Sequence, residues 1–263
     1  MLYLLSPAKR LDYETPVPAA VERRATEPLF TAEAAELIAL MRRKTPAQVA
    51  TLMKLSDALA QLNVGRYAAW QPRADHGNSK PALLAFAGDV YEGLQAGTLK
   101  AADLDWAQRH LVILSGLYGA LRPLDRLQPY RLEMGTPLPN ARGKDLYAFW
   151  GDTLARHLDE RLAAARGARV VVNLASGEYA RAALRPALAA RVVDCVFEDW
   201  KGGRYRIIGF FAKRARGLMA RWAIEQRVDV PERLPRFEAE GYAFDAAASA
   251  RDRLVFRRRA GPA

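Results

Sequence analysis

The chain has 263 residues, of which 51% are hydrophobic, so it can bury a substantial core in one large domain or two small ones. Its 40 lysines and arginines outnumber 29 aspartates and glutamates and give a net charge of +11. Such a charge favours polyanionic partners, although it does not separate DNA, RNA, a nucleotide and an anionic membrane surface. Cys195 is the only cysteine, which excludes an intramolecular disulfide.

No apolar segment reaches the length that spans a bilayer, and the first residues, MLYLLSPAKR, have too short an apolar run for a secretory signal. A single cysteine also fits a reducing compartment. We therefore expect a cytoplasmic protein that does not associate with membranes.

A first buried strand is expected at residues 2–5, where the apolar run stops at Ser6 and Pro7. Lys9 and Arg10 then follow in a loop. Because α/β proteins place binding groups in the turn after such a strand, this loop is a candidate binding segment.

Helical periodicity begins at Thr31, and a second helix is expected to begin at Thr45-Pro46. Threonine is a good N-cap and proline suits the first helical position. A third helix, capped at residues 56–57, is expected to be interrupted at 63–66.

Two short helices joined by a tight turn, with Lys54 and Arg66 nearby, are similar to a helix-hairpin-helix, whose backbone amides hold a DNA phosphate. Ordinary packing of two helices explains the same pattern. Both interpretations remain open on this stretch alone.

A second group of apolar runs predicts buried strands at 82–86 and 111–114. The second of these strands is followed by three arginines, Arg122, Arg126 and Arg131. Their guanidinium groups repel one another unless they are solvated, paired or facing a polyanion, and their geometry suits phosphate oxygens. This predicts an anion-binding cleft.

Pairing of these arginines with local carboxylates such as Asp125 and Glu133 is an equally open interpretation. The loop that follows adds Arg142 and Lys144 and leads into a helix expected at 146–165.

A further buried strand is expected at 169–174, and strands at 192–197 and 204–211 are expected to be joined by a turn at Lys201-Gly202-Gly203. The last strand is expected at 254–256, and the three arginines that follow it, at 257–259, are expected to form a frayed basic end.

The helix expected at 213–227 places Lys213, Arg214 and Arg216 with further arginines opposite an apolar side. So many cations on one helix face favour a binding surface. A solvated face is the alternative.

The three histidines lack the spacing of a zinc or iron site, and no Walker A, GxGxxG or GxSxG motif is present. We therefore expect neither a metal nor a cofactor. Asp89, Asp145, Asp152 and Glu178 lie at element ends where catalytic acids occur, and capping or pairing with arginines is the alternative role for each.

Long motifs spread over almost the whole chain resemble the YaaA family of bacterial peroxide-stress proteins. They are SPAK at 6–9, FAGDVYEGL at 86–94, LSGLYGALRPLDRLQPYRLEMG at 114–135, GKDLYAFWGD at 143–152, VVNLASGEY at 171–179, KRARGLMARWAIEQR at 213–227 and EGYAFD at 240–245. The resemblance implies a cytosolic protein that helps cells survive hydrogen peroxide by limiting free iron and hence damage to DNA. It also implies a single-domain α/β fold with a positively charged cleft, a helix-hairpin-helix and DNA binding.

We therefore expect one compact α/β domain over residues 1–263, with a mixed central sheet flanked by helices and a helix-hairpin-helix-like insertion near 31–70. The expected function is peroxide protection by a monomer that binds double-stranded or distorted DNA with low sequence specificity. Tyr67 and Tyr130 are expected to stack on unpaired bases. The side chains expected to contact DNA phosphates are Lys9, Lys54, Arg66, Arg122, Arg126, Arg131, Arg142, Lys144, Lys213, Arg214 and Arg216.

The alternative is an enzyme that acts on a nucleotide or another small anionic substrate in the same arginine-lined cleft. Shape separates the two, since a duplex needs a wide groove and a small substrate needs a deep pocket with a carboxylate beside the arginines.

Overall fold

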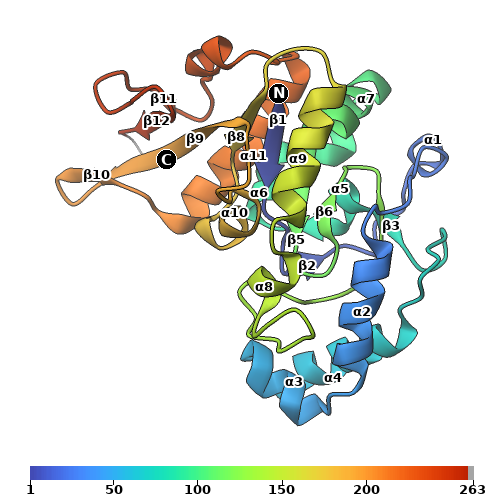
Figure 1. The fold of residues 1–263 in the computed structure, drawn as a ribbon. Helices are drawn as coiled ribbons and strands as arrows, with labels where there is room; N and C mark the ends of the chain where they lie inside the picture. The colour runs from blue at the N-terminus through green and yellow to red at the C-terminus, as the bar shows by residue number, and fades with distance from the viewer. Residues whose placement is uncertain (260–263) are drawn as a thin grey trace.

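The apolar runs of the sequence form the centre of a mainly parallel sheet in the computed structural model, which describes residues 1–259 (Figure 1). The strand order is β11-β12-β9-β8-β1-β5-β6, and β10 pairs with β9 outside this path. The five central strands, from β12 to β5, run parallel, whereas β6, β10 and β11 are antiparallel to their neighbours. Their bounds are β1 Leu2–Leu5, β5 Leu111–Ser115, β6 Gly119–Leu121, β8 Val170–Asn173, β9 Arg191–Lys201, β10 Arg204–Arg206, β11 Ala243–Phe244 and β12 Arg253–Arg258.

The strands β1 and β5 are buried along their whole length. Near-continuous apolar runs of this kind are typical of parallel strands that are covered on both faces. The chain is thus a single compact domain of mixed α/β class, with its sheet flanked by helices, as the sequence predicts.

The flanking helices pack in two groups. In one group α11, Gly209–Glu225, crosses α6, Asp89–Leu94, and contacts α7, Ala101–His110. In the other, α10, Gly177–Ala183, contacts α8, Leu146–Trp150, and α9, Thr153–Ala164.

The crossing of α6 and α11 depends on two glycines. A Cβ atom added at Gly217 would lie 1.8 Å from the carbonyl oxygen of Val90, and one at Gly93 would lie 2.3 Å from the carbonyl oxygen of Arg214. Only glycine permits backbones to approach this closely. The two helices are therefore held at a fixed separation.

Residues 31–69 form the predicted helical subregion, with α2 at Thr31–Arg42, α3 at Pro46–Met53 and α4 at Asp57–Ala69. The predicted N-caps of α3 and α4 are confirmed. Thr45 forms a capping box with Gln48, and the hydroxyl of Ser56 accepts a bond from the N–H of Leu59. The predicted interruption at 63–66 is wrong, because a glycine inside an otherwise helical pattern is tolerated.

Three further expectations differ from the structure. Residues 82–86 form the helix α5, Ala82–Ala85, and the strand β4, Phe86–Ala87, because a short apolar run fits a buried helix turn as well as a strand. The helix expected at 146–165 is broken at Gly151, whose φ of 46° ends α8. The segment 204–211, which was expected to be one strand, forms β10 at its beginning and the first turn of α11 at its end.

The expected frayed end at 257–259 is also wrong, because Arg257 and Arg258 belong to β12 and Arg258 is only 4% exposed. The remaining elements are short: α1 Ala19–Glu22, β2 Arg10–Leu11, β3 Lys80–Pro81, β7 Arg126–Leu127, and the 3-10 turns η1 Ala96–Thr98 and η2 Pro231–Arg236. Within residues 1–259, no helix combines the length and the apolarity that crossing a membrane requires.

His157 on α9 makes the stability of the fold depend on pH. Its ring packs edge-on against Phe30, and burial, followed by the charges of Arg161 and Arg122, lowers the pKa of His157 from 6.5 to about 4. Between these values the unfolded chain binds a proton that the folded chain does not, so stability falls as pH drops through this window. We expect this residue to contribute a loss of about 1.5 kcal/mol between about pH 6.5 and pH 5.

Urea unfolding at both pH values, for the wild type and for His157→Gln, measures this contribution. The variant should lose clearly less stability on acidification than the wild type, whereas His76→Gln, at an exposed loop position, should behave as the wild type does. Equal losses in the wild type and in His157→Gln would show that the histidine is not responsible.

Candidate anion-binding site

A cavity of about 520 Å³ opens beside the carboxyl ends of the parallel strands β1 and β8. Its lining comes from the loop after β1, the loop after β8 with the start of α10, the segment Tyr130–Glu133, and the helices α6 and α11. Parallel α/β sheets bind their ligands at this edge. The fold therefore places five segments that are distant in the sequence around one candidate site.

Two serines join the strand ends at the cavity wall. The backbone N–H of Ser176 donates to the Ser6 hydroxyl oxygen over 2.8 Å, and the two hydroxyl oxygens lie 3.3 Å apart. The hydroxyl of Tyr91 donates to the Ser6 carbonyl oxygen over 3.0 Å. These bonds hold both turns in place and leave hydroxyl groups at the cavity.

The lining carries five cations and four carboxylates. Most of these charges pair across the cavity wall. Glu133 lies 3.0 Å from Arg131 and 3.6 Å from Lys9, and Asp89 lies 3.7 Å from Lys213. The other pair is Arg10 with Glu92, at 3.2 Å. The remaining carboxylate, Glu178, accepts a bond from the backbone N–H of Gly135.

Arg216 is the exception among the cavity cations. Across residues 1–259, its guanidinium has no carboxylate partner and its Nε, which is shielded from solvent, has no hydrogen-bond acceptor. Burial alone lowers the pKa of Arg216, without a countercharge to oppose it. A half-buried cation without a countercharge is less stable than a paired one, which favours the binding of an anion at this cavity.

Three tyrosines, Tyr91, Tyr130 and Tyr179, contribute to the lining, and burial raises the pKa of each. Their phenols are therefore neutral hydrogen-bonding groups at physiological pH. The hydroxyl of Tyr130 is already bonded to that of Ser115 at 2.6 Å.

The prediction that Tyr67 stacks on a base is wrong, because its ring is 1% exposed and its hydroxyl bonds to the carbonyl oxygen of Arg131. Tyr130 touches the cavity but is only 5% exposed. Both residues are better described as core tyrosines that position the cavity wall.

The structure brings four of the predicted cations to the cavity, namely Lys9, Arg131, Lys213 and Arg216. Arg66 on α4 does not line the cavity, and burial, with a smaller effect of the Arg131 charge, lowers the pKa of Arg66. Lys54 and Lys144 are exposed residues outside the cavity lining, and neither has a carboxylate partner in the part of the chain that is described.

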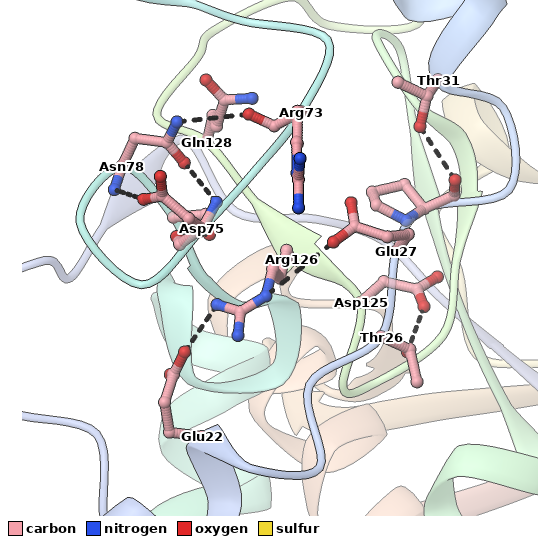
Figure 2. Close-up of polar contacts among 12 residues, drawn as sticks. Glu22, Thr26, Glu27, Thr31, Arg73, Asp75, Asn78, Asp125, Arg126 and Gln128 are labelled. Carbon is pink, nitrogen blue, oxygen red and sulfur yellow. Dashed lines mark hydrogen bonds and ion pairs between the residues drawn. The ribbon is translucent and has the colours of Figure 1, made fainter.

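Arg122 and Arg126 do not reach the cavity, and both are held in ion pairs. Arg122 donates to Asp125, whose side chain is fully buried and also accepts a bond from Thr26. Arg126 lies between Glu22, at 2.5 Å, and Glu27, at 4.0 Å (Figure 2). For these two residues the structure shows the pairing that the sequence left as an alternative.

Two other predicted residues are also paired outside the cavity. Arg142 binds Glu36 at 2.9 Å and lies over the ring of Phe149, and Arg214 binds Glu240 at 2.5 Å. The shift of the Arg214 pKa is upward, because Glu240 hydrogen-bonds its charged form. These arginines hold elements of the fold together.

Of the four acids noted at element ends, Asp89 and Glu178 line the cavity. Asp145 instead caps α8 by accepting from the N–H of Ala148, and Asp152 pairs with Arg185 at 2.7 Å. Tyr91 and Tyr179 were not predicted, because their sequence context is indistinguishable from that of core aromatics. In the described residues no group of three or more histidine, cysteine, aspartate or glutamate side chains could hold a metal ion.

The fold and the cavity define an α/β protein with a candidate anion-binding site at the carboxyl edge of a parallel sheet. The chain belongs to the family described as peroxide stress protein YaaA, whose model matches residues 1–248. This confirms the family resemblance seen in the sequence motifs.

Similar proteins are known from several bacteria under the name UPF0246 protein. The one from Leptothrix cholodnii is 66% identical over 258 residues, which cover 98% of each chain. Those from Paracidovorax citrulli and Variovorax paradoxus are 61% and 60% identical, over 98% and 99% of this chain and 99% and 100% of their own.

Proposed function

We propose that this protein protects cells against peroxide by binding DNA, and that bound DNA is thereby shielded from iron-dependent oxidative damage. Membership of the peroxide stress family supports the protective role. The single observation that carries the DNA proposal is that Lys54 and Arg66, on neighbouring parts of the helical subregion, lack carboxylate partners within residues 1–259 of a chain with net charge +11.

The proposed DNA-binding surface, here called the basic face, consists of Lys54 and Arg66 together with Lys9 and Arg131, two cations that share the single carboxylate of Glu133. Tyr67 anchors α4 to this surface through its bond to the carbonyl oxygen of Arg131. The turn between α3 and α4 contributes Lys54, whose φ of 52° lets the chain reverse between the helices. A helix-hairpin-helix on this turn would present backbone amides and a lysine to the same phosphate backbone.

Replacing Lys54 and Arg66 together by glutamine tests this surface. We expect duplex affinity to fall at least about tenfold at moderate salt, and the dependence of log K on log salt to become shallower by about two, one for each lost phosphate contact. Fluorescence anisotropy with duplexes of several sequences measures both. Glutamine keeps much of each side-chain stem, so the fold should be preserved.

Arg156→Ala is the matched control, since this exposed arginine on α9 contributes nothing to the cavity lining or the basic face. Its affinity and salt dependence should match the wild type. If the double variant binds as tightly as the Arg156→Ala control, the basic face is assigned wrongly.

A second candidate is an enzyme that acts on a nucleotide or another small anionic substrate. One observation favours it: Glu133 and Asp89 lie beside arginine and lysine side chains in a cavity of about 520 Å³. Release of a new product from deoxynucleotides or DNA, detected by mass spectrometry, would establish this candidate.

A further inference from the structure

We propose that the cavity holds one nucleotide unit, with its phosphate on the guanidinium of Arg216. The inference rests on the proposed DNA binding only for the source of the nucleotide, which is either an unpaired nucleotide of a DNA strand or a free mononucleotide. The phosphate contact itself is argued from the guanidinium of Arg216, which lines this cavity as well as a smaller one beside β9 and has no ion-pair partner within residues 1–259.

Arg216 differs from other cations of α11 in its lack of an ion-pair partner within residues 1–259. Lys213, Arg214 and Arg221 lie on the same helix, and each has a carboxylate partner, at 3.7, 2.5 and 2.8 Å. Arg216 has none in the described chain, and its Nε is both shielded from solvent and without a hydrogen-bond partner. Since a guanidinium stays charged in proteins, a ligand anion is the natural partner for it.

The backbone of α11 at Arg216 is held in place. Gly217, the next residue, is in close contact with the carbonyl of Val90 on α6, so α11 does not slide relative to the cavity. The helix therefore presents the Arg216 side chain at the cavity, and the planar fork of a guanidinium matches two phosphate oxygens.

Other side chains of the cavity lining can bind the rest of the ligand. The hydroxyl groups of Ser6 and Ser176 can donate to phosphate or sugar oxygens, and the neutral tyrosines Tyr91 and Tyr179 provide apolar surface with polar tips. The carboxylate of Glu178 can accept from an exocyclic amino group of a base. A ligand with one anionic group, hydroxyls and a planar amino-bearing ring satisfies this lining.

The cavity volume of about 520 Å³ limits the size of the ligand that it can enclose. It lies within the range of roughly 300–1,000 Å³ that is usual for pockets enclosing a small molecule. One nucleotide fits such a space, whereas a duplex does not. A nucleotide of a DNA strand must therefore leave the base stack to enter, at a cost of a few kcal/mol that is smallest for unpaired bases.

The test is calorimetric titration of the four deoxynucleoside monophosphates and of inorganic phosphate into the wild type, Arg216→Met and Arg214→Met. We expect at least one nucleotide to bind the wild type more tightly than phosphate does. Arg216→Met should weaken it at least tenfold, and Arg214→Met, which removes a paired arginine of the same helix, by less than twofold. Thermal melting checks that both variants are folded.

Duplexes with and without one unpaired nucleotide separate the two sources. A preference of at least fivefold for the unpaired nucleotide, lost in Arg216→Met, assigns the site to DNA strands. Nucleotide binding without that preference assigns it to free mononucleotides. Should Arg216→Met not fold, Arg216→Lys replaces it, and loss of the bidentate fork should weaken binding at least threefold.

The inference is overturned if no mononucleotide binds and no preference for an unpaired nucleotide exists, or if either effect survives loss of the Arg216 guanidinium. Failure of the proposed function looks different. In that case the wild type binds no duplex, while mononucleotide binding that depends on Arg216 persists.

Discussion

Gly217→Ala is expected to destabilise the protein by about 3 kcal/mol or more, because the new methyl group has no space. Its carbon would lie 1.8 Å from the carbonyl oxygen of Val90 and 2.9 Å from the backbone nitrogen of Leu94. These are backbone atoms of α6, so no side-chain rotation relieves the clash. The helices α6 and α11 would have to separate, which would also displace Asp89, Lys213 and Arg216 at the cavity.

Gly65→Ala is the matched control for this prediction. Gly65 lies in the middle of α4, and a Cβ atom added there meets nothing within 4 Å. Because alanine is the better helix former, we expect a gain of about 0.5–1 kcal/mol. Urea denaturation measures both changes, and a loss below 1 kcal/mol for Gly217→Ala would contradict the tight helix crossing.

Asp199→Ala is expected to cost about 3–5 kcal/mol, because it removes one partner of a buried ion pair. Asp199 is 3% exposed and accepts hydrogen bonds from Nε of Arg258 and from the hydroxyl of Tyr242, both over 2.7 Å, while Nη2 of Arg258 lies 2.6 Å from the same carboxylate as an ion pair. Its loss leaves the guanidinium of Arg258, which is 4% exposed, without its countercharge. The parallel pair β9–β12 should then become the weakest part of the sheet.

The control is Asp252→Ala, which breaks the exposed ion pair between Asp252 and Arg191 at 2.6 Å, at the other end of the same two strands. An exposed pair contributes less than about 1 kcal/mol. Denaturant titration of both variants should therefore show a difference of at least about 2 kcal/mol. Similar costs for the two would mean that Asp199 is not acting as a buried countercharge.

The sheet was the most predictable part of the fold, and the reason is physical. The strands β1, β5 and β8 are uninterrupted apolar runs that end in polar turns, and such runs have few alternatives in a globular protein. The cap at Thr45 was equally predictable, because capping depends on neighbouring residues only. The continuous helix through Gly65 and the helix turn within residues 82–86 were not predicted, because both depend on tertiary packing, which the local sequence does not contain.

The candidate site was predicted in part. The loop with Lys9, the helix with Lys213 and Arg216, and the segment with Arg131 do meet at one cavity. Nothing in the sequence separates these cations from Arg126, because that distinction depends on Glu22, which is distant in the sequence but lies 2.5 Å away in the fold. An arginine is available for binding when the fold leaves it unpaired, and only the structure shows which arginines those are.

The most direct test of the central proposal is the affinity of the wild type for a duplex at two salt concentrations, measured by fluorescence anisotropy. If the basic face neutralises about four phosphates, affinity should fall about 100-fold between about 50 and 200 mM salt, and similarly for unrelated sequences. Absence of duplex binding at the lower salt concentration, or binding that does not weaken with salt, would contradict the proposal that this protein acts on DNA through its basic face.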